Sequence, residues 1–418
     1  MSVFNSDVRF FGLSLPAAQT TQSSFQVESK WGTVDLLHEI ADEWMELCRE
    51  GPCEQPFYRP EWIAAAIQAF FRHRRVLLIT VRRGGRLRAV LPLVEEKGFG
   101  TGTRLRSASM IPRFELVHGP GAEAADAVRA AWQHLRQLRN WDVIELANVP
   151  EGGAAELLVT AAKEDSFPTG RHEFARTPYA LLHEHKPVKD FSHLGRSSRF
   201  RGQLRQGWRE ISKRGSVRLR RTEKADAATL QGFYRLEQSG WKGREATAIL
   251  SKKELQSFYD AIASYAEQFG YLSMYFLEVD DVPVAAHLGL TYAGRYYPIK
   301  VAYDENYSQY RPGHLIIGRV LEDCIERGII EVDFLGDWTE AKAKWTSDVR
   351  PHVVCRVFRN SAIGHLLHLQ DDLRHKLTQS LRKAHRSAMA VAGSYMSRAK
   401  NGKPRSGRGD KNDSPQPA

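Results

Sequence analysis

The segment from Lys300 to Leu315 combines basic, aromatic and glycine residues in an order that indicates a ligand-binding site. It leaves an apolar strand, crosses a polar aromatic loop and enters a helix whose first turn contains Pro312 and Gly313. The free N–H groups and the positive end of the helix dipole at such a terminus can bind a pyrophosphate or a carboxylate. The pattern indicates an anion site, and the alternative is that Pro-Gly only begins a helix.

Two further clusters combine carboxylates, glycines and tryptophans. Asp333 ends a hydrophobic strand, where it is either a functional carboxylate or a cap for the turn that follows. Trp241 and Lys242 lie between Gly240 and Gly243, which permit close approach of the backbone. Trp241 therefore either lines a pocket or anchors a loop in the core.

Helices and strands alternate in the segments that must position these clusters. Apolar residues recur at helical spacing from Leu255 to Phe269, and a second amphipathic helix begins at Pro312. The first half repeats this order more faintly, and its strand over 142–146 corresponds to the strand over 330–334. We therefore predict a duplicated α/β (α+β) unit. The strands predicted in the second half cover 271–279, 284–290, 295–301 and 329–335.

The positive charge of the chain is concentrated in two segments. The 418 residues include 60 Lys+Arg and 49 Asp+Glu, a net charge of +11. Residues 196–221 and 374–418 each carry +9, which leaves −7 for the rest. This distribution excludes a uniformly basic coat protein. No apolar run is long enough to span a bilayer, no secretory signal is evident, and the four cysteines fit neither a zinc site nor a disulfide scaffold. We expect a cytoplasmic protein without a metal.

Together these clusters, in this order, resemble the BioF2-like or CelD-like acyltransferase family of the GNAT superfamily, which is related to the FemAB-type transferases. The resemblance covers roughly residues 35–360. It implies tandem GNAT-like units, each a mixed, mostly antiparallel sheet flanked by helices, with the working site in the second. The motifs that carry it are Leu236-Glu237, Gly240 to Gly243, Val282 to His287, Lys300 to Asp304, Tyr307, Arg311 to Leu315, Asp333 to Asp337, and Lys344-Trp345.

The resemblance and the composition divide the chain into six predicted segments. These are an N-terminal extension over 1–34, a first, degenerate GNAT-like domain over 35–190, an Arg-rich linker helix over 191–222, a second GNAT-like domain over 223–361, a basic C-terminal helix over 362–400, and a tail over 401–418. The tail is expected to be disordered because it has nothing apolar to bury.

The resemblance also implies roles for individual residues. GNAT enzymes move an acyl group from a thioester to an amine, which requires a base, an oxyanion donor and an acid. The candidate bases are Asp304, Asp333 and His287, although a lone histidine in a strand is more often structural. The candidate acid is Tyr303 or Tyr307, and the oxyanion donor is the backbone of 300–303. The candidate donor-binding residues are Lys300, Val301, Arg311, Gly313, His314 and Leu315. The candidate acceptor-binding residues are Trp241, Lys242, Tyr307, Asp337, Lys344, Trp345, Arg201 and Arg205.

One departure from the family bears on the acyl donor. The usual phosphate loop has several glycines, whereas Arg311 to His314 offers one glycine and a proline without an N–H group. We favour acyl-CoA, and an aminoacyl-tRNA, which Fem-type relatives use, remains the alternative. The family implies an amino-sugar or lipid-linked acceptor from exopolysaccharide or cell-envelope biosynthesis. The arginines of 196–221 would hold a diphosphate or touch the anionic inner membrane, or form a solvated helix. A non-catalytic scaffold or nucleic-acid-binding protein is the remaining alternative, and nucleic acid is not the expected partner.

Overall fold

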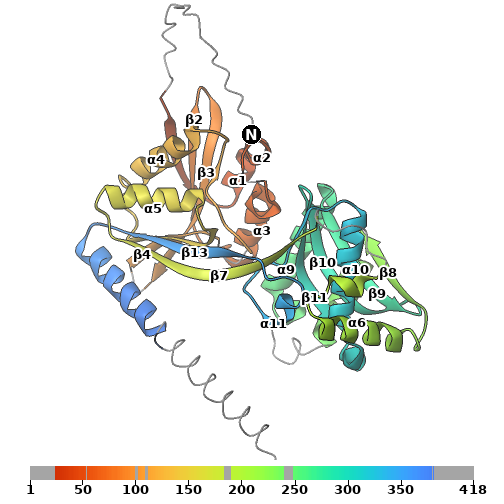
Figure 1. Ribbon diagram of the computed structural model, residues 1–418. Helices are drawn as coiled ribbons and strands as arrows, with labels where there is room; N and C mark the ends of the chain where they lie inside the picture. The colour runs from red at the N-terminus through yellow and green to blue at the C-terminus, as the bar shows by residue number, and fades with distance from the viewer. Residues whose placement is uncertain are drawn as a thin grey trace, which may run out of the picture.

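The computed structural model describes residues 24–52, 54–98, 102–108, 112–182, 190–239, 248–378 and 380 (Figure 1). Trp241 and Lys242 lie outside the described residues, and so does the predicted tail over 401–418. Most of the predicted N-terminal extension, and residues 381–400 of the predicted C-terminal helix, also lie outside them.

The first half of the chain forms helices and strands in an order that resembles that of the second half. Its elements are β1 (Gln26–Gly32), α1 (Asp35–Glu39), α2 (Ala41–Glu50), η1 (Pro56–Tyr58), α3 (Pro60–Phe70), β2 (Val76–Arg83), β3 (Arg86–Gly98), β4 (Gly102–Arg106), β5 (Val117–His118), α4 (Glu123–Leu135), β6 (Val143–Pro150), α5 (Ala154–Glu164) and β7 (Thr169–Leu181). Helices α4 and α5 pack against each other beside these strands (Figure 1).

The second half contains the helix–strand series that the sequence predicts around Pro312. Its elements are η2 (Phe191–Leu194), α6 (Ser198–Ile211), β8 (Val217–Thr222), α7 (Ala227–Ser239), η3 (Ile249–Ser251), α9 (Lys253–Gln268), β9 (Leu272–Val279), β10 (Val282–Tyr292), β11 (Arg295–Tyr303), η4 (Glu305–Tyr310), α10 (Pro312–Glu326), β12 (Glu331–Asp333), α11 (Glu340–Ala343) and β13 (Val349–Phe358). A last helix covers 362–378.

The strands of both halves join into one mostly antiparallel sheet. Among the described residues its order is β1-β2-β3-β4-β6-β13-β7-β12-β11-β10-β9-β8. This arrangement confirms the predicted fold class. Strand β7 pairs with β13 over 169–178 and then with β12 over 179–181, so it runs from one half into the other (Figure 1). Strand β13 lies in the range predicted for the second domain but pairs with β6 of the first half. Backbone pairing of this kind leaves no composition signal, so a linear domain boundary could not anticipate it.

The Arg-rich segment differs from the single linker helix that the sequence predicts over 191–222. Residues 198–211 form α6, but 217–222 form β8, which pairs antiparallel with β9. The Nε atoms of Arg218 and Arg220 each lie 2.7 Å from the buried carboxylate of Glu278. Val217 and Leu219 alternate with these arginines and pack on the core, which is the period of a strand. The high arginine content concealed this alternation.

Packing between helices holds the two halves together on one side of the sheet. Trp62 of α3 and Phe258 of α9 meet edge to face, with ring centroids 5.8 Å apart. Phe57 of η1 meets Tyr297 of β11 in the same way at 5.2 Å. Buried aromatic pairs of this geometry add roughly 0.5–1.5 kcal/mol each beyond the area that they bury. The first half therefore packs directly against the strand that borders the candidate site.

Candidate active site

The candidate site lies where two parallel strands of the second half separate. Strands β11 and β12 pair only at two positions, where Arg295 and Tyr296 face Glu331 and Val332. Beyond them, β11 stays paired with β10 but contains a β-bulge at Ile299. A bulge adds a residue and turns the strand locally. The sheet therefore opens between the second part of β11 and the segment that follows β12.

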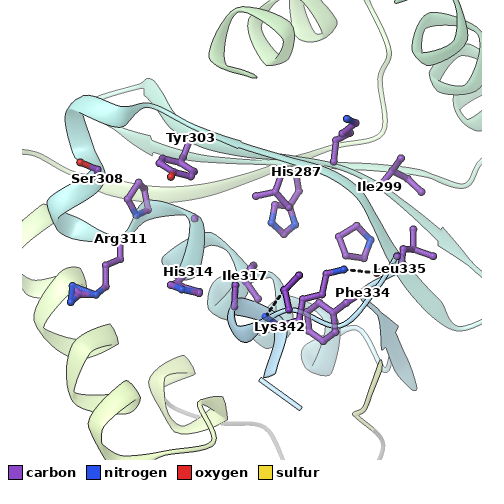
Figure 2. A pocket seen from close by; sticks show the side chains of 18 residues that line it. His287, Ile299, Tyr303, Ser308, Arg311, His314, Ile317, Phe334, Leu335 and Lys342 are labelled. Atoms are coloured by element: carbon purple, nitrogen blue, oxygen red, sulfur yellow. Dashed lines mark hydrogen bonds between the residues drawn. The ribbon is translucent and has the colours of Figure 1, made fainter. Parts of the chain in front are cut away.

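A cavity of about 690 Å³ occupies this opening (Figure 2). The strands β10 and β11 form one wall, the beginning of α10 another, and the segment over 334–342 the third. The structure brings seven of the predicted site residues together in its lining: His287, Lys300, Val301, Tyr303, Arg311, Gly313 and His314.

The ionisable side chains in the lining are basic or phenolic. Lys300, Arg311 and Lys342 line the cavity together with His287 and His314, and the described lining residues include no Asp or Glu. The side chain of Lys300 lies 3.6 Å from the buried carboxylate of Glu237, which offsets one charge. The remaining charges favour an anionic ligand, because the apolar side chains around them weaken solvent screening.

Lys342 is a lining residue that the sequence analysis missed. Its Nζ donates a hydrogen bond to the carbonyl oxygen of Leu335 (Figure 2) and another to that of Asp337 at 2.9 Å. Burial lowers its pKa. The lysine thus fixes the segment after β12 and places its amino group beside the cavity. Its position two residues before Lys344, in the cluster already noted, was the signal available in the sequence.

His287 is 1% exposed and points from β10 into the middle of the lining, where it borders the cavity (Figure 2). Its Nδ1 lies 3.4 Å from the hydroxyl of Tyr296, and the two rings are nearly parallel. Burial raises the pKa of Tyr296 well above its usual value, so the phenol keeps its proton. The phenol oxygen can accept from Nδ1–H, which places the lone pair of a neutral imidazole on Nε2, where it can take up a proton.

His314 occupies the first turn of α10. Its Nε2 lies 3.4 Å from Nζ of Lys344, and burial followed by the charges of Lys344 and Arg311 lowers its pKa to about 4. The imidazole is therefore neutral at neutral pH. Because Nε2 accepts from the ammonium group, the proton resides on Nδ1. This buried Nδ1 has no hydrogen-bond partner among the described residues, so it is available to an acceptor atom of a ligand.

Backbone geometry at the start of α10 places these groups. Arg311 precedes the helix with φ of 60°, in the left-handed region, and Pro312 follows at the first helical position. A Cβ atom on Gly313 would lie 3.2 Å from the ring of Tyr303. Glycine thus allows the phenol to lie directly over the helix terminus, whose first N–H groups lack intrahelical acceptors.

The two carboxylates predicted as bases lie outside the cavity lining. Asp333 is fully buried, forms ion pairs with Arg113 and with Arg350 at 3.4 Å, and accepts from the backbone N–H of Leu335 at 2.9 Å. Asp304 caps η4 by accepting from the backbone N–H of Asn306 at 2.9 Å. Both positions are those of structural carboxylates.

Other predicted residues also lie away from the cavity lining. Leu315 and Trp345 are buried in the core. Asp337 accepts a hydrogen bond from the backbone N–H of Arg176 at 2.9 Å. Tyr307 lies in η4. Lys344 reaches the site through His314. Arg201 and Arg205 of α6 contact the η2 region instead, at Gly195 and Ser192.

The corresponding opening in the first half is filled by its own chain. Strands β4 and β6 form a parallel pair like β11 and β12. Beyond that pair the chain turns back, and the N–H of Phe114 donates to the carbonyl of Asn148 at 3.2 Å. Glu115 accepts from the N–H of Ala155 at the start of α5, and burial raises its pKa to about 7. Phe114 and Glu115 thus occupy space that is open in the second half.

Comparisons with known proteins found a family model and several solved structures that this chain resembles. Residues 198–343 match the family model of an acetyltransferase (GNAT) domain. The crystal structure of FemX is 12% identical, with a TM-score of 0.55, over 82% of this chain and 100% of that one. A tandem GNAT protein from the clavulanic acid biosynthesis pathway is 13% identical, with a TM-score of 0.46. The alignment covers 81% of this chain and 100% of that protein. No curated protein matches.

The chain therefore shares its fold with FemX, and residues 198–343 are similar to a GNAT acetyltransferase domain. The matched range begins at Ser198 and therefore includes α6. Within the described residues no three His, Cys, Asp or Glu side chains are grouped to hold a metal ion. None of the described helices is long and apolar enough to cross a membrane.

Proposed function

We propose that the protein is an N-acyltransferase that transfers an acyl group from acyl-CoA to an amine, within the BioF2-like or CelD-like family. The observation that carries this proposal is the cationic cavity at the point where β11 and β12 separate, at the N-terminus of α10. A helix terminus and nearby cations favour the diphosphate of a coenzyme. The part of β11 that no longer pairs with β12 can contact the amide-containing arm of the donor.

In the proposed reaction the acceptor nitrogen attacks the thioester carbonyl. The new C–N bond forms, the oxygen becomes an oxyanion, and collapse of this intermediate breaks the C–S bond. A backbone N–H of β11 near the bulge at Ile299 stabilises the oxyanion. His287 takes the proton from the amine, and Tyr303 gives a proton to the departing thiolate.

His287 is a better candidate base than the other titratable groups near the cavity. His314 has a pKa of about 4, so it is a weak base at neutral pH and instead donates from Nδ1. Asp304 and Asp333 already accept from a backbone N–H or an arginine. We therefore place the proton transfer at His287 and the binding of the donor at His314, Arg311 and Lys342.

The acceptor class follows from the family resemblance. We propose an amino-sugar or a lipid-linked saccharide of exopolysaccharide or cell-envelope biosynthesis. Mass spectrometry of surface polysaccharide and lipid-linked precursors, with and without the protein, identifies the acylated product. An unchanged profile of both fractions would exclude this acceptor class.

An aminoacyl-tRNA donor is the second candidate. Pro312 removes one N–H from the turn that would bind a diphosphate, and the fold is shared with FemX. Turnover that requires charged tRNA, and is absent with acyl-CoA, would favour this candidate.

Calorimetry with coenzyme A and acetyl-CoA tests the donor site. We expect binding that weakens about tenfold in Arg311→Gln and in Lys342→Met, because each loses a charged contact. Arg205 lies outside the cavity lining, so Arg205→Gln is the control and should bind coenzyme A with unchanged affinity. His287→Gln should keep binding and lose between about 10² and 10⁴ in kcat. Absence of binding by the unaltered protein would overturn the acyl-CoA proposal.

A further inference from the structure

The helix over 362–378 exposes an apolar stripe. Five large apolar side chains in it are between 54% and 64% exposed: Ile363, Leu366, Leu369, Leu373 and Leu377. At about 100° per residue they fall within one arc of roughly 120°. They make up five of the eleven large apolar side chains that are exposed among the described residues. A stripe of this size on one helix is more than the scattered exposure usual for a folded surface.

The opposite face of the helix holds it on the first half of the sheet (Figure 1). Leu367 packs with Val143 and Phe358. Asp371 lies 2.9 Å from both His172 and Arg356, and the ring of His375 stacks on that of His172. The helix is thus anchored through one face, and the stripe remains exposed in the folded chain.

Positive charge flanks the stripe. At the helical angle per residue, Arg374 and Lys376 lie about 20° beyond its two edges, and the arc between them contains no acidic residue. Lysine and arginine at the edge of an apolar face can extend their charged ends towards lipid headgroups while their stems remain in apolar surroundings. Further along the chain come Arg382, Lys383 and Arg386.

From this arrangement we infer that the stripe, defined as Ile363, Leu366, Leu369, Leu373 and Leu377, docks on the surface of an anionic lipid bilayer. The apolar face enters the boundary between headgroups and acyl chains, and the basic residues pair with anionic headgroups. The segment 374–418 carries +9, which attracts an anionic surface and repels a second copy of the same segment. Charge complementarity therefore favours an anionic bilayer over a second copy of the chain. This inference does not depend on the proposed acyl transfer.

Flotation of the full chain with vesicles tests the inference. Vesicles of phosphatidylcholine and phosphatidylglycerol in a three-to-one ratio should carry the protein upward, and vesicles of phosphatidylcholine alone should carry much less. In the triple variant Leu366→Gln, Leu369→Gln, Leu373→Gln, we expect the partition coefficient between vesicles and water to fall about tenfold or more. Because these side chains are exposed, the variant should keep its circular dichroism spectrum and thermal midpoint.

A matched control replaces three exposed apolar residues elsewhere: Leu157→Gln, Val282→Gln and Ile330→Gln, which are 43%, 58% and 44% exposed. This control should float like the unaltered protein. The inference is overturned if the unaltered protein does not float, or if the stripe variant floats as well as the control, which would assign the contact to the basic tail alone. A dimer in analytical ultracentrifugation that dissociates only in the stripe variant, without flotation, would also overturn it.

Discussion

Arg113 and Asp333 form an ion pair that joins the two halves of the chain, and their side chains are only 3% and 0% exposed. Arg113 lies in the segment that fills the opening of the first half, next to Phe114. Asp333 ends β12, where the cavity of the second half begins. One short segment of the first half thus fills its own opening and holds the strand end at the candidate active site.

This pair leads to a prediction about stability. Asp333→Ala should lower the free energy of unfolding by about 3–5 kcal/mol, because it leaves the Arg113 guanidinium buried without its carboxylate. Urea unfolding followed by circular dichroism measures the change. The double variant Arg113→Met, Asp333→Leu should recover part of the loss, since apolar side chains of similar volume can replace a buried pair. A large loss of kcat in Asp333→Asn at unchanged stability would show instead that Asp333 is the base.

A second prediction concerns Asp304, which caps η4. Asp304→Ala should cost about 1 kcal/mol of stability, as the loss of a capping side chain does, and should leave kcat nearly unchanged. Steady-state kinetics beside thermal unfolding separates the two effects. Asp226→Ala is a matched control, because Asp226 accepts from the backbone N–H of Thr229 at the start of α7. If Asp304→Ala loses a hundredfold in kcat while the control does not, the assignment of the base to His287 is wrong.

A third prediction concerns pH. The pKa of His314 is lowered to about 4, and burial, helped by the charge of Arg113, lowers that of His352 to about 4. A histidine of the unfolded chain titrates near about 6.5. Between these values the unfolded state binds protons that the folded state does not, so the free energy of unfolding falls as pH is lowered through this window.

We expect each of the two histidines to contribute about 1–3 kcal/mol to this loss. His314→Gln and His352→Gln should each flatten the dependence of the urea midpoint on pH between neutral pH and pH 4. His193→Gln, whose side chain is 64% exposed, is the control with an unchanged slope. If the dependence of the urea midpoint on pH is unchanged in both variants, burial of these two histidines does not cause the loss of stability at low pH.

A fourth prediction separates binding from stability at Arg311. Its φ of 60° costs about 1–2 kcal/mol for a residue with a Cβ atom. Arg311→Gly removes this strain but loses more conformational entropy on folding, so the thermal midpoint should change little. The variant also loses a cation at the cavity, so KM for the acyl donor should rise several-fold. A lower thermal midpoint with an unchanged KM would show that the arginine serves only the helix start.

Local patterns in the sequence predicted the second half well. Helical spacing up to Phe269, the turn before Pro312 and the apolar strands correspond to α9, α10 and strands β9 to β12. These patterns work because the period of the apolar residues depends on neighbours along the chain. The same reasoning missed β8, since arginines occupied one face of an alternating strand.

The fold class, the helix terminus at Pro312 and the motifs that resemble GNAT acyltransferases could all be inferred from the order of the residues. Which of the candidate residues line one cavity became clear from the three-dimensional packing. His287, His314 and Lys342 come from three different elements, and they meet because β11 and β12 separate. Asp333 directly precedes Phe334, which lines the same cavity, but its side chain pairs with Arg113, which is 220 residues away in the sequence. A carboxylate buried beside an arginine and one exposed to substrate have the same local sequence signature, and only long-range packing distinguishes them.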